Sequence, residues 1–143
     1  MTEISFSSIA GGIIYLSTVK LADELLKEET PPPPPSWNKD VVDMMKEKAS
    51  LYHTNYNYDC SEIADDLYNA AGGKGIIYEI TPSKGELIVP EYGVNQNFIY
   101  HTIYSDGTYI YDPRYNIEPI LNDVYMNMLK QLNPNGIIVK KEC

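Results

Sequence analysis

The sequence predicts an α+β domain, and two observations lead to that class. Two stretches with helix-capping residues and apolar residues at helical spacing, 38–50 and 59–72, come first. Several short stretches rich in Ile, Val and Tyr follow, and a third helical stretch, 118–132, precedes the last of them, 136–141. Helices set apart from a run of antiparallel strands are typical of the α+β class.

Length and composition limit the classes of function. The 143 residues are enough for one domain, and 43% hydrophobic residues are enough for a core. The formal net charge of -9 argues against a nucleic-acid or anionic-membrane partner, because both require a basic surface. It fits a soluble protein or one that binds a basic partner. The two cysteines, Cys60 and Cys143, are too few for a disulfide framework, and a cysteine at the chain end is usually incidental.

No cofactor or metal is expected. Two histidines and two cysteines show no CxxC or HxxxH spacing. The stretch "AAGGKG" is a helix stop and not a phosphate-binding loop.

The N-terminal part is expected to be separate from the domain. Residues 4–19 are apolar but include five Ser or Thr, follow an acidic residue, and are short for a membrane span. They are a poor Sec signal and favour an amphipathic or docking helix. A membrane-inserting segment is the alternative, although stable insertion is not expected. Five prolines at 31–35 indicate a stiff linker or, alternatively, an SH3-type ligand. The predicted division is 1–36, helical segment and linker, and 37–143, catalytic domain.

The first helix of the domain is expected to begin after Asn38, a good capping residue, and to run to about Ser50. Residues 51–59, rich in Tyr and Asn, are expected to form a loop. The apolar side of this helix is formed by Val41, Val42, Met45 and Ala49.

The second helix has both ends marked. Asp59 is an N-cap with Glu62 three residues later, and Gly72-Gly73 ends the helix. One apolar stripe starts at Cys60 and continues through Ile63, Ala64, Leu67, Tyr68 and Ala71. Cys60 therefore falls in the first turn, on the buried side.

The rest of the chain is expected to form strands and one helix. The strands are "GIIYEIT", "ELIVP", the hairpin 98–112 and "GIIVKK". The helix is expected from about Glu118 to Leu132, with Pro119 in its first turn.

The hairpin places a histidine near an aspartate. Asp106-Gly107 indicates a two-residue type I′ turn that pairs Ser105 with Thr108. Counting outward from that turn puts His101 directly opposite Asp112, with Cβ atoms about 5 Å apart. Both share an inward face with three isoleucines, Ile99, Ile103 and Ile110. The tyrosine-rich opposite face is expected to be covered by a helix, with a substrate cleft or a protein contact as the alternative. Such a pair can be purely structural, stabilising the hairpin.

Cys60 adds a catalytic interpretation. A thiol at a helix N-terminus beside a protonated histidine favours the thiolate, and an acid that orients the histidine completes a triad. The candidate catalytic residues are Cys60, His101 and Asp112. The alternative for Cys60 is a small buried core residue.

An acyl-transfer site also needs donors for the oxyanion. The backbone N–H of Cys60 is one candidate, and a side-chain donor is expected from Asn55 or Tyr58. Asn55 can equally be a plain turn residue. The other histidine, His53, is expected in a loop or on the surface.

These motifs carry a resemblance. "YDCSEIADDLYNAAGG" followed by "FIYHTIYSDGTYIYDPRYN" resembles the papain-fold toxin domains of bacterial polymorphic toxins, over about residues 38–116. The resemblance implies a papain-like core and a triad of Cys60, His101 and Asp112. "DCS" is also similar to NlpC-type peptidases, although Glu62 replaces their usual glycine. The hairpin also resembles transglutaminase-like and arylamine acetyltransferase cores.

The resemblance implies a thiol hydrolase or acyltransferase acting on an amide or isopeptide bond of a protein or peptide-like substrate. It further implies delivery into a competitor cell and a cognate immunity protein. Two alternatives stay open: a cytosolic transglutaminase- or NlpC-like amidase, and a catalytically silent module that binds a partner.

Overall fold

The structure is a computed structural model that describes residues 35–55 and 58–142. The expected N-terminal helix, its membrane-inserting alternative, most of the proline run and Cys143 lie outside these residues. None of the described helices is long and apolar enough to cross a membrane.

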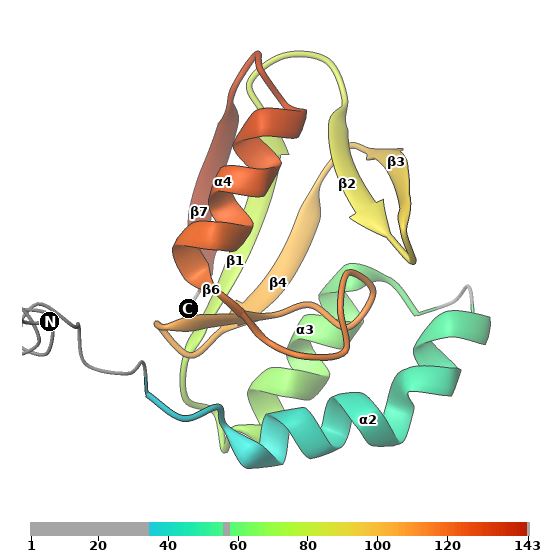
Figure 1. The fold of residues 1–143 in the computed structure, drawn as a ribbon, viewed down its shortest axis with the longest axis vertical. Coiled ribbons are helices and arrows are strands. Elements are labelled where there is room, and N and C mark those ends of the chain that lie inside the picture. Colours follow the sequence, from blue (N-terminus) through green and yellow to red (C-terminus); the bar gives the residue numbers. More distant parts are fainter. Residues whose placement is uncertain (1–34, 56–57, 143) are drawn as a thin grey trace, which may run out of the picture. The chain divides into compact units, whose positions relative to one another are not determined.

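The predicted α+β class is confirmed. Within the described residues the chain forms three helices, α2 (Lys39–Thr54), α3 (Cys60–Ala70) and α4 (Asn122–Leu132). The strands are β1 (Ile76–Pro82), β2 (Leu87–Glu91), β3 (Val94–Phe98), β4 (His101–Ser105), β5 (Tyr109–Tyr111), β6 (Ile120–Leu121) and β7 (Ile137–Glu142). They make an antiparallel sheet in the order β6-β5-β4-β1-β7 and a separate antiparallel pair, β2-β3 (Figure 1).

The first two helices begin where the sequence predicts. The Asn38 side chain accepts a hydrogen bond from the N–H of Val41, and that of Asp59 accepts one from Glu62 at 3.0 Å. Helix α2 continues to Thr54, so the expected loop at 51–59 is partly wrong. Tyr52 is fully buried on the apolar side of α2, and its packing accounts for the extra turn.

The predicted start of the third helix, about Glu118, is too early. It begins at Asn122, because Ile120 and Leu121 pair with β5 as strand β6. The N–H of Asn122 then donates to the carbonyl of Thr108 at 2.9 Å, which ties the start of the helix to the hairpin. Pro119 therefore precedes a strand and does not lie in the first helical turn.

One strand was missed. β3 pairs with β2 through a tight turn at Tyr92 and Gly93, whose φ angles of 52° and 79° are both left-handed. Left-handed values at both central positions are those of a type I′ hairpin, which tolerates glycine easily and tyrosine only with strain. The glycine alone was a weak turn signal, because the tyrosine before it is unusual there.

The core lies on both faces of the five-stranded sheet. Side chains alternate along a strand, so Tyr104 and Tyr111 point to one face and Ile103 and Ile110 to the other. Helices α2 and α3 cover the tyrosine face, as expected, through Val41, Val42, Met45, Tyr52, Ile63 and Leu67. Helix α4 and strand β2 cover the isoleucine face through Leu87, Val89, Tyr125 and Leu129.

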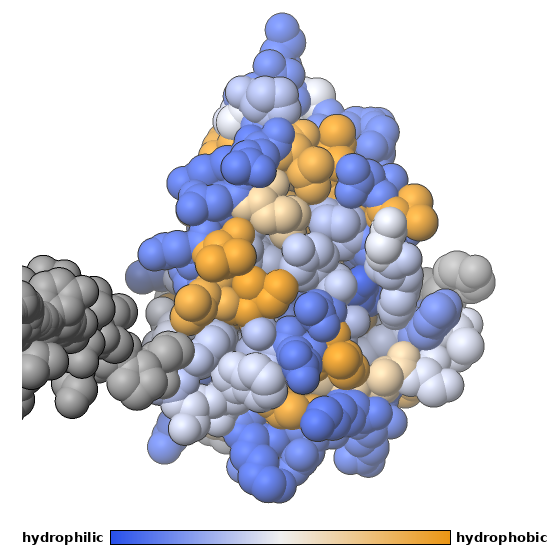
Figure 2. Space-filling model, viewed as in Figure 1, coloured by the Kyte–Doolittle hydropathy of each residue, from blue (hydrophilic) through white to orange (hydrophobic). Residues whose placement is uncertain are grey.

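The outer surface on the α4 side is mainly hydrophilic. Figure 2 shows its hydrophobic side chains in small, separate patches. One patch lies over β6 and the start of α4, where Leu121 is 41% and Val124 is 56% exposed. A small apolar patch of this kind is ordinary on a protein surface.

The predicted hairpin register is wrong by two residues. Ser105 pairs with Ile110 and Tyr104 with Tyr111, and the three residues 106–108 connect β4 to β5. The side chain of Asp106 causes this, because it accepts from the N–H groups of Thr108 and Tyr109 at 2.9 and 2.7 Å and widens the turn. A shift of two leaves every side chain on its predicted face.

Two consequences follow for the site. His101 and Asp112 are in contact, but they are not directly opposite, because the register is shifted by two residues and β5 ends at Tyr111. Ile99 is 78% exposed, so its predicted inward position is wrong. The cause is that β4 begins only at His101.

The segment before α2 contacts the sheet. The hydroxyl of Tyr109 donates to the carbonyl of Pro35 at 2.8 Å, and Trp37 packs edge-on against the Tyr109 ring. The N–H of Asn38 donates to the hydroxyl of Tyr111 at 2.7 Å. These contacts lie on both sides of the predicted domain boundary between residues 36 and 37. The boundary itself remains a prediction.

A chain shortened to begin at Trp37 is expected to fold and to keep a reactive Cys60. It loses the hydrogen bond to Pro35, which costs about 1 kcal/mol of unfolding free energy. A chain that begins at Pro35 is the matched control. Urea unfolding and thiol labelling of both chains check the prediction. Aggregation or complete unfolding of the two would place residues before Pro35 in the core.

Candidate active site

Cys60 is the first residue of α3, and the structure holds its sulfur against β4. The backbone N–H of Thr102 donates to Cys60 Sγ at 3.4 Å, and the hydroxyl of Ser61 donates to Thr102 Oγ1 at 3.4 Å. Cys60 itself is half-buried. The start of the helix is thus fixed to the strand residue that follows His101.

His101 and Asp112 form a buried pair. The carboxylate Oδ2 of Asp112 lies 2.9 Å from Nε2 of His101, and both residues are more than nine-tenths buried. The other ring nitrogen of His101, Nδ1, is buried and has no hydrogen-bond partner. Cys60, His101 and Asp112 line one small cavity of about 10 Å³, so the structure brings the three predicted residues together.

Electrostatics favour the charged forms of this pair. Burial alone lowers the pKa of His101, but the Asp112 carboxylate and the neighbouring Cys60 side chain raise it to about 10. Burial likewise raises the pKa of Asp112, but the charge and hydrogen bond of His101 outweigh it and hold that pKa below its usual value.

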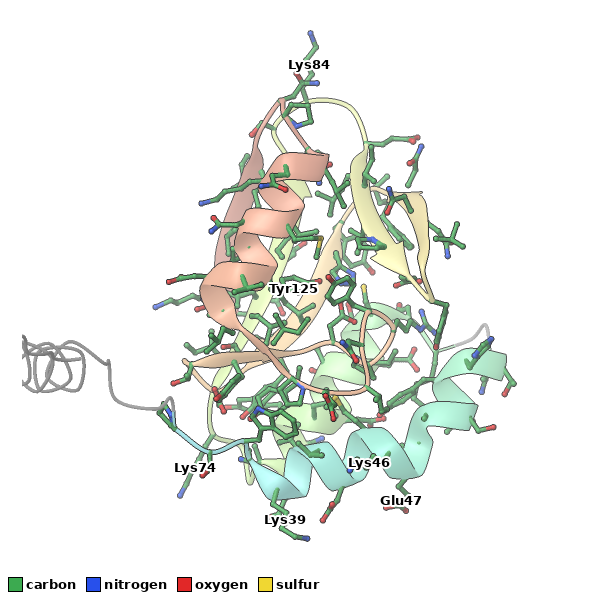
Figure 3. The ribbon with its side chains drawn as sticks, in the orientation of Figure 1. Lys39, Lys46, Glu47, Lys74, Lys84 and Tyr125 are labelled. Atoms are coloured by element: carbon green, nitrogen blue, oxygen red, sulfur yellow. The ribbon has the colours of Figure 1, made fainter. Side chains whose placement is uncertain are left out.

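Tyr125 is a third member of this network that the sequence reasoning missed. Tyr125 projects from α4 (Figure 3), and its hydroxyl donates to Asp112 Oδ2 at 2.7 Å. Burial, followed by the charge of Asp112, raises the pKa of Tyr125 well above 10, so the hydroxyl remains a donor. One oxygen of Asp112 is thereby held between His101 and Tyr125.

Two adjoining pockets share four lining residues, and the smaller one includes Cys60. The first has a volume of about 190 Å³ and is lined by Tyr58, Asp59, Cys60, Glu91, Phe98, Ile99, Tyr100 and Arg114. The second, of about 420 Å³, is lined by Tyr52, His53, Asn55, Tyr58, Glu91, Tyr92, Gln96, Phe98 and Arg114. We call the two together the Glu91 groove, because both pockets share that residue. The groove runs from the candidate nucleophile to the tip of the β2-β3 hairpin.

The predicted oxyanion residues lie in different parts of the groove. Tyr58 lines the pocket that contains Cys60, whereas Asn55 lines only the larger one. The oxyanion role of each stays a prediction. His53 is exposed, as expected, but it lies in the last turn of α2 and stacks on Tyr92 with ring centroids 4.3 Å apart.

Glu91 and Arg114 also belong to the site and were missed. Strand β2 alternates Leu87, Val89 and Glu91 on its buried face, and this period-two pattern could have revealed an inward carboxylate. Arg114 donates through Nη2 to the carbonyls of Tyr52 and Tyr58, at 3.1 and 2.5 Å. It anchors the segment that precedes Cys60, and no short-range pattern predicts such a contact.

Comparison with known proteins gave no match among family models, curated proteins or solved structures. Among the described residues, no three His, Cys, Asp or Glu side chains gather where they could hold a metal ion.

Proposed function

We propose that the chain is a papain-like thiol hydrolase or acyltransferase that cleaves an amide or isopeptide bond. The observation that carries the proposal is the arrangement around His101. Its Nε2 is bound to Asp112, while its Nδ1 is unpaired on the cavity that Cys60 also lines. A histidine with one nitrogen oriented by an acid and the other free beside a thiol has the geometry of a general acid–base.

The proposed cycle has two halves. The Cys60 thiolate attacks the carbonyl carbon, and the C–N bond breaks as His101 gives its proton to the leaving amine. The resulting thioester is attacked by water or by an acceptor amine, whose proton passes to His101. The thiolate then leaves and the pair is restored. Asp112, held by Tyr125, orients the ring throughout.

The oxyanion of each tetrahedral intermediate needs preorganised donors. The backbone N–H of Cys60, at the N-terminus of α3, is one of the four N–H groups that no intrahelical bond uses. The helix dipole adds partial positive charge at the same point. In this proposal Tyr58, on the wall of the same pocket, supplies the side-chain donor.

We further propose that this chemistry serves a toxin or effector that is delivered into a competitor cell. What supports it is the resemblance of the Cys60, His101 and Asp112 motifs to papain-fold toxin domains, together with the proline run before the domain. Under this proposal the producing cell protects itself with an immunity protein. A protein or peptide-like substrate fits a groove of this size.

Expression of the whole chain in a test bacterium checks this proposal. The wild-type chain is expected to arrest growth when directed to one compartment, the cytoplasm or the periplasm, and Cys60→Ala is expected to be harmless there. Cys143→Ala removes the other cysteine and is the matched control, which should stay toxic. Unimpaired growth with soluble wild-type chain in both compartments would exclude the toxin function.

A further inference from the structure

Glu91 is a buried acid, and one of its two carboxyl oxygens has no hydrogen-bond partner. It ends β2 on the same face as Leu87 and Val89, and only 5% of its surface is exposed. Its Oε2 is buried without a hydrogen-bond partner. A buried carboxyl group without a partner is costly, so such groups in folded proteins are normally paired.

The two cations near Glu91 are already engaged. His101 is bound to Asp112 through Nε2, and Arg114 donates through Nη2 to two backbone carbonyls. Burial, chiefly, and the charge of Asp112 raise the pKa of Glu91, while His101 and Arg114 oppose that rise. The described residues thus surround the carboxyl with charge but give its Oε2 no donor.

The walls around Glu91 are aromatic. Tyr58 and Phe98 line both pockets, and the stacked rings of His53 and Tyr92 lie at the far end. Aromatic faces attract cations, and they also pack against an apolar stem. Arg114 Nε is buried without a partner as well, so the groove also has one N–H to offer an oxygen atom of the same ligand.

We propose that the Glu91 groove binds a cationic group of the substrate, an ammonium or guanidinium on an apolar stem, and holds it beside Cys60. This specificity rests on the proposed thiol chemistry and adds to it a class of substrate. Glu91 supplies the pairing charge, and Tyr58 and Phe98 enclose the stem. The net charge of -9 also favours the approach of a cationic substrate.

Charged thiol reagents test this binding without any knowledge of the substrate. Three methanethiosulfonates transfer an aminoethylthio, a methylthio or a sulfonatoethylthio group to the Cys60 thiolate, which forms a mixed disulfide and releases methanesulfinate. The rate of modification at Cys60 is followed by mass spectrometry of the whole chain. The neutral methyl reagent reports the reactivity of the thiol itself, so the ratio of cationic to neutral rates isolates the effect of charge.

The wild-type ratio at Cys60 is expected to exceed the ratio at Cys143 about tenfold or more, and Glu91→Gln should remove most of that excess. Glu62→Gln is the matched control, because Glu62 is exposed in the first turn of α3 and lies in neither pocket. It should change the ratio less than about twofold, as expected for a surface charge. Butylammonium and butylguanidinium, added as competitors, then show which cation is preferred.

An unchanged ratio in Glu91→Gln would overturn the inference. If that variant does not fold, the wild-type chain suffices: a cationic-to-anionic ratio at Cys60 no higher than at Cys143 would overturn it equally. Failure of the proposed function looks different. In that case the neutral reagent would modify Cys60 no faster than Cys143, whatever the charge preference.

Discussion

Replacing Cys60 or His101 with alanine is expected to abolish acyl transfer, a loss of several orders of magnitude in turnover. Cys60 is the proposed nucleophile, and without His101 no group is placed to stabilise its thiolate or to activate the water that hydrolyses the thioester. Turnover is measured as release of p-nitrophenolate from p-nitrophenyl acetate, which needs no knowledge of the natural substrate. Circular dichroism of each variant checks that the fold is retained.

Asp112→Asn is expected to cost less, about 10- to 10⁴-fold. The amide keeps the shape of the side chain but loses the charge that stabilises the imidazolium at 2.9 Å. Adding Asp112→Asn to His101→Ala should cost almost nothing more, because a residue that orients His101 has no role once the ring is gone. Additive losses, or full turnover in Asp112→Asn alone, would mean that the pair only stabilises the hairpin.

Local chemistry made much of this site predictable. The caps at Asn38 and Asp59 are single side chains that satisfy N–H groups a few residues away, so the sequence alone locates both helix starts. The cap at Asp59 also locates Cys60 in the first helical turn. Strand periodicity then placed His101 and Asp112 on one face, and that conclusion survived a register error because the error was an even number of residues.

The hairpin register could not be predicted from the Asp106-Gly107 dipeptide alone. Asp106-Gly107 favours a two-residue turn, but the Asp106 carboxylate also accepts from the hydroxyl of Tyr111 at 2.6 Å. Together with its two backbone bonds, this contact stabilises a wider connection. One of these bonds uses the N–H of Thr108, which a type I′ turn would instead pair with Ser105 across the strands.

Partners distant in sequence were not predictable from pattern. Tyr125 reaches Asp112 from a helix whose start was misplaced, and Arg114 reaches carbonyls that lie 56 and 62 residues away. Such contacts depend on how the elements pack. Glu91 was predictable in part. The period-two pattern of β2 indicates that its side chain points inward, but no local pattern shows that it lines the same pocket as Cys60.

Alkylation of Cys60 by iodoacetamide is expected to be about 10- to 100-fold faster than that of Cys143 at pH 6. An unperturbed thiol, with a pKa near 8.5, is almost wholly protonated at that pH. In the proposed ion pair His101 stays protonated, because Asp112 and Cys60 outweigh burial and raise its pKa to about 10. The imidazolium is therefore present at all lower pH values and is lost only as pH rises through about 10.

The pH profile is the decisive form of this experiment. The ratio of the Cys60 rate to the Cys143 rate should be largest at low pH, where an unperturbed thiol is almost wholly protonated and its rate rises about tenfold per pH unit below 8.5. In His101→Ala the Cys60 profile should become that of an ordinary thiol. Asp112→Asn removes the carboxylate that raises the pKa of His101, so the imidazolium beside Cys60 is less stable and the Cys60 rate at pH 6 should fall toward that of an ordinary thiol. A Cys60 profile that already follows an ordinary thiol in the wild-type chain would show that no thiolate–imidazolium pair forms, and the proposed nucleophile would have to be abandoned.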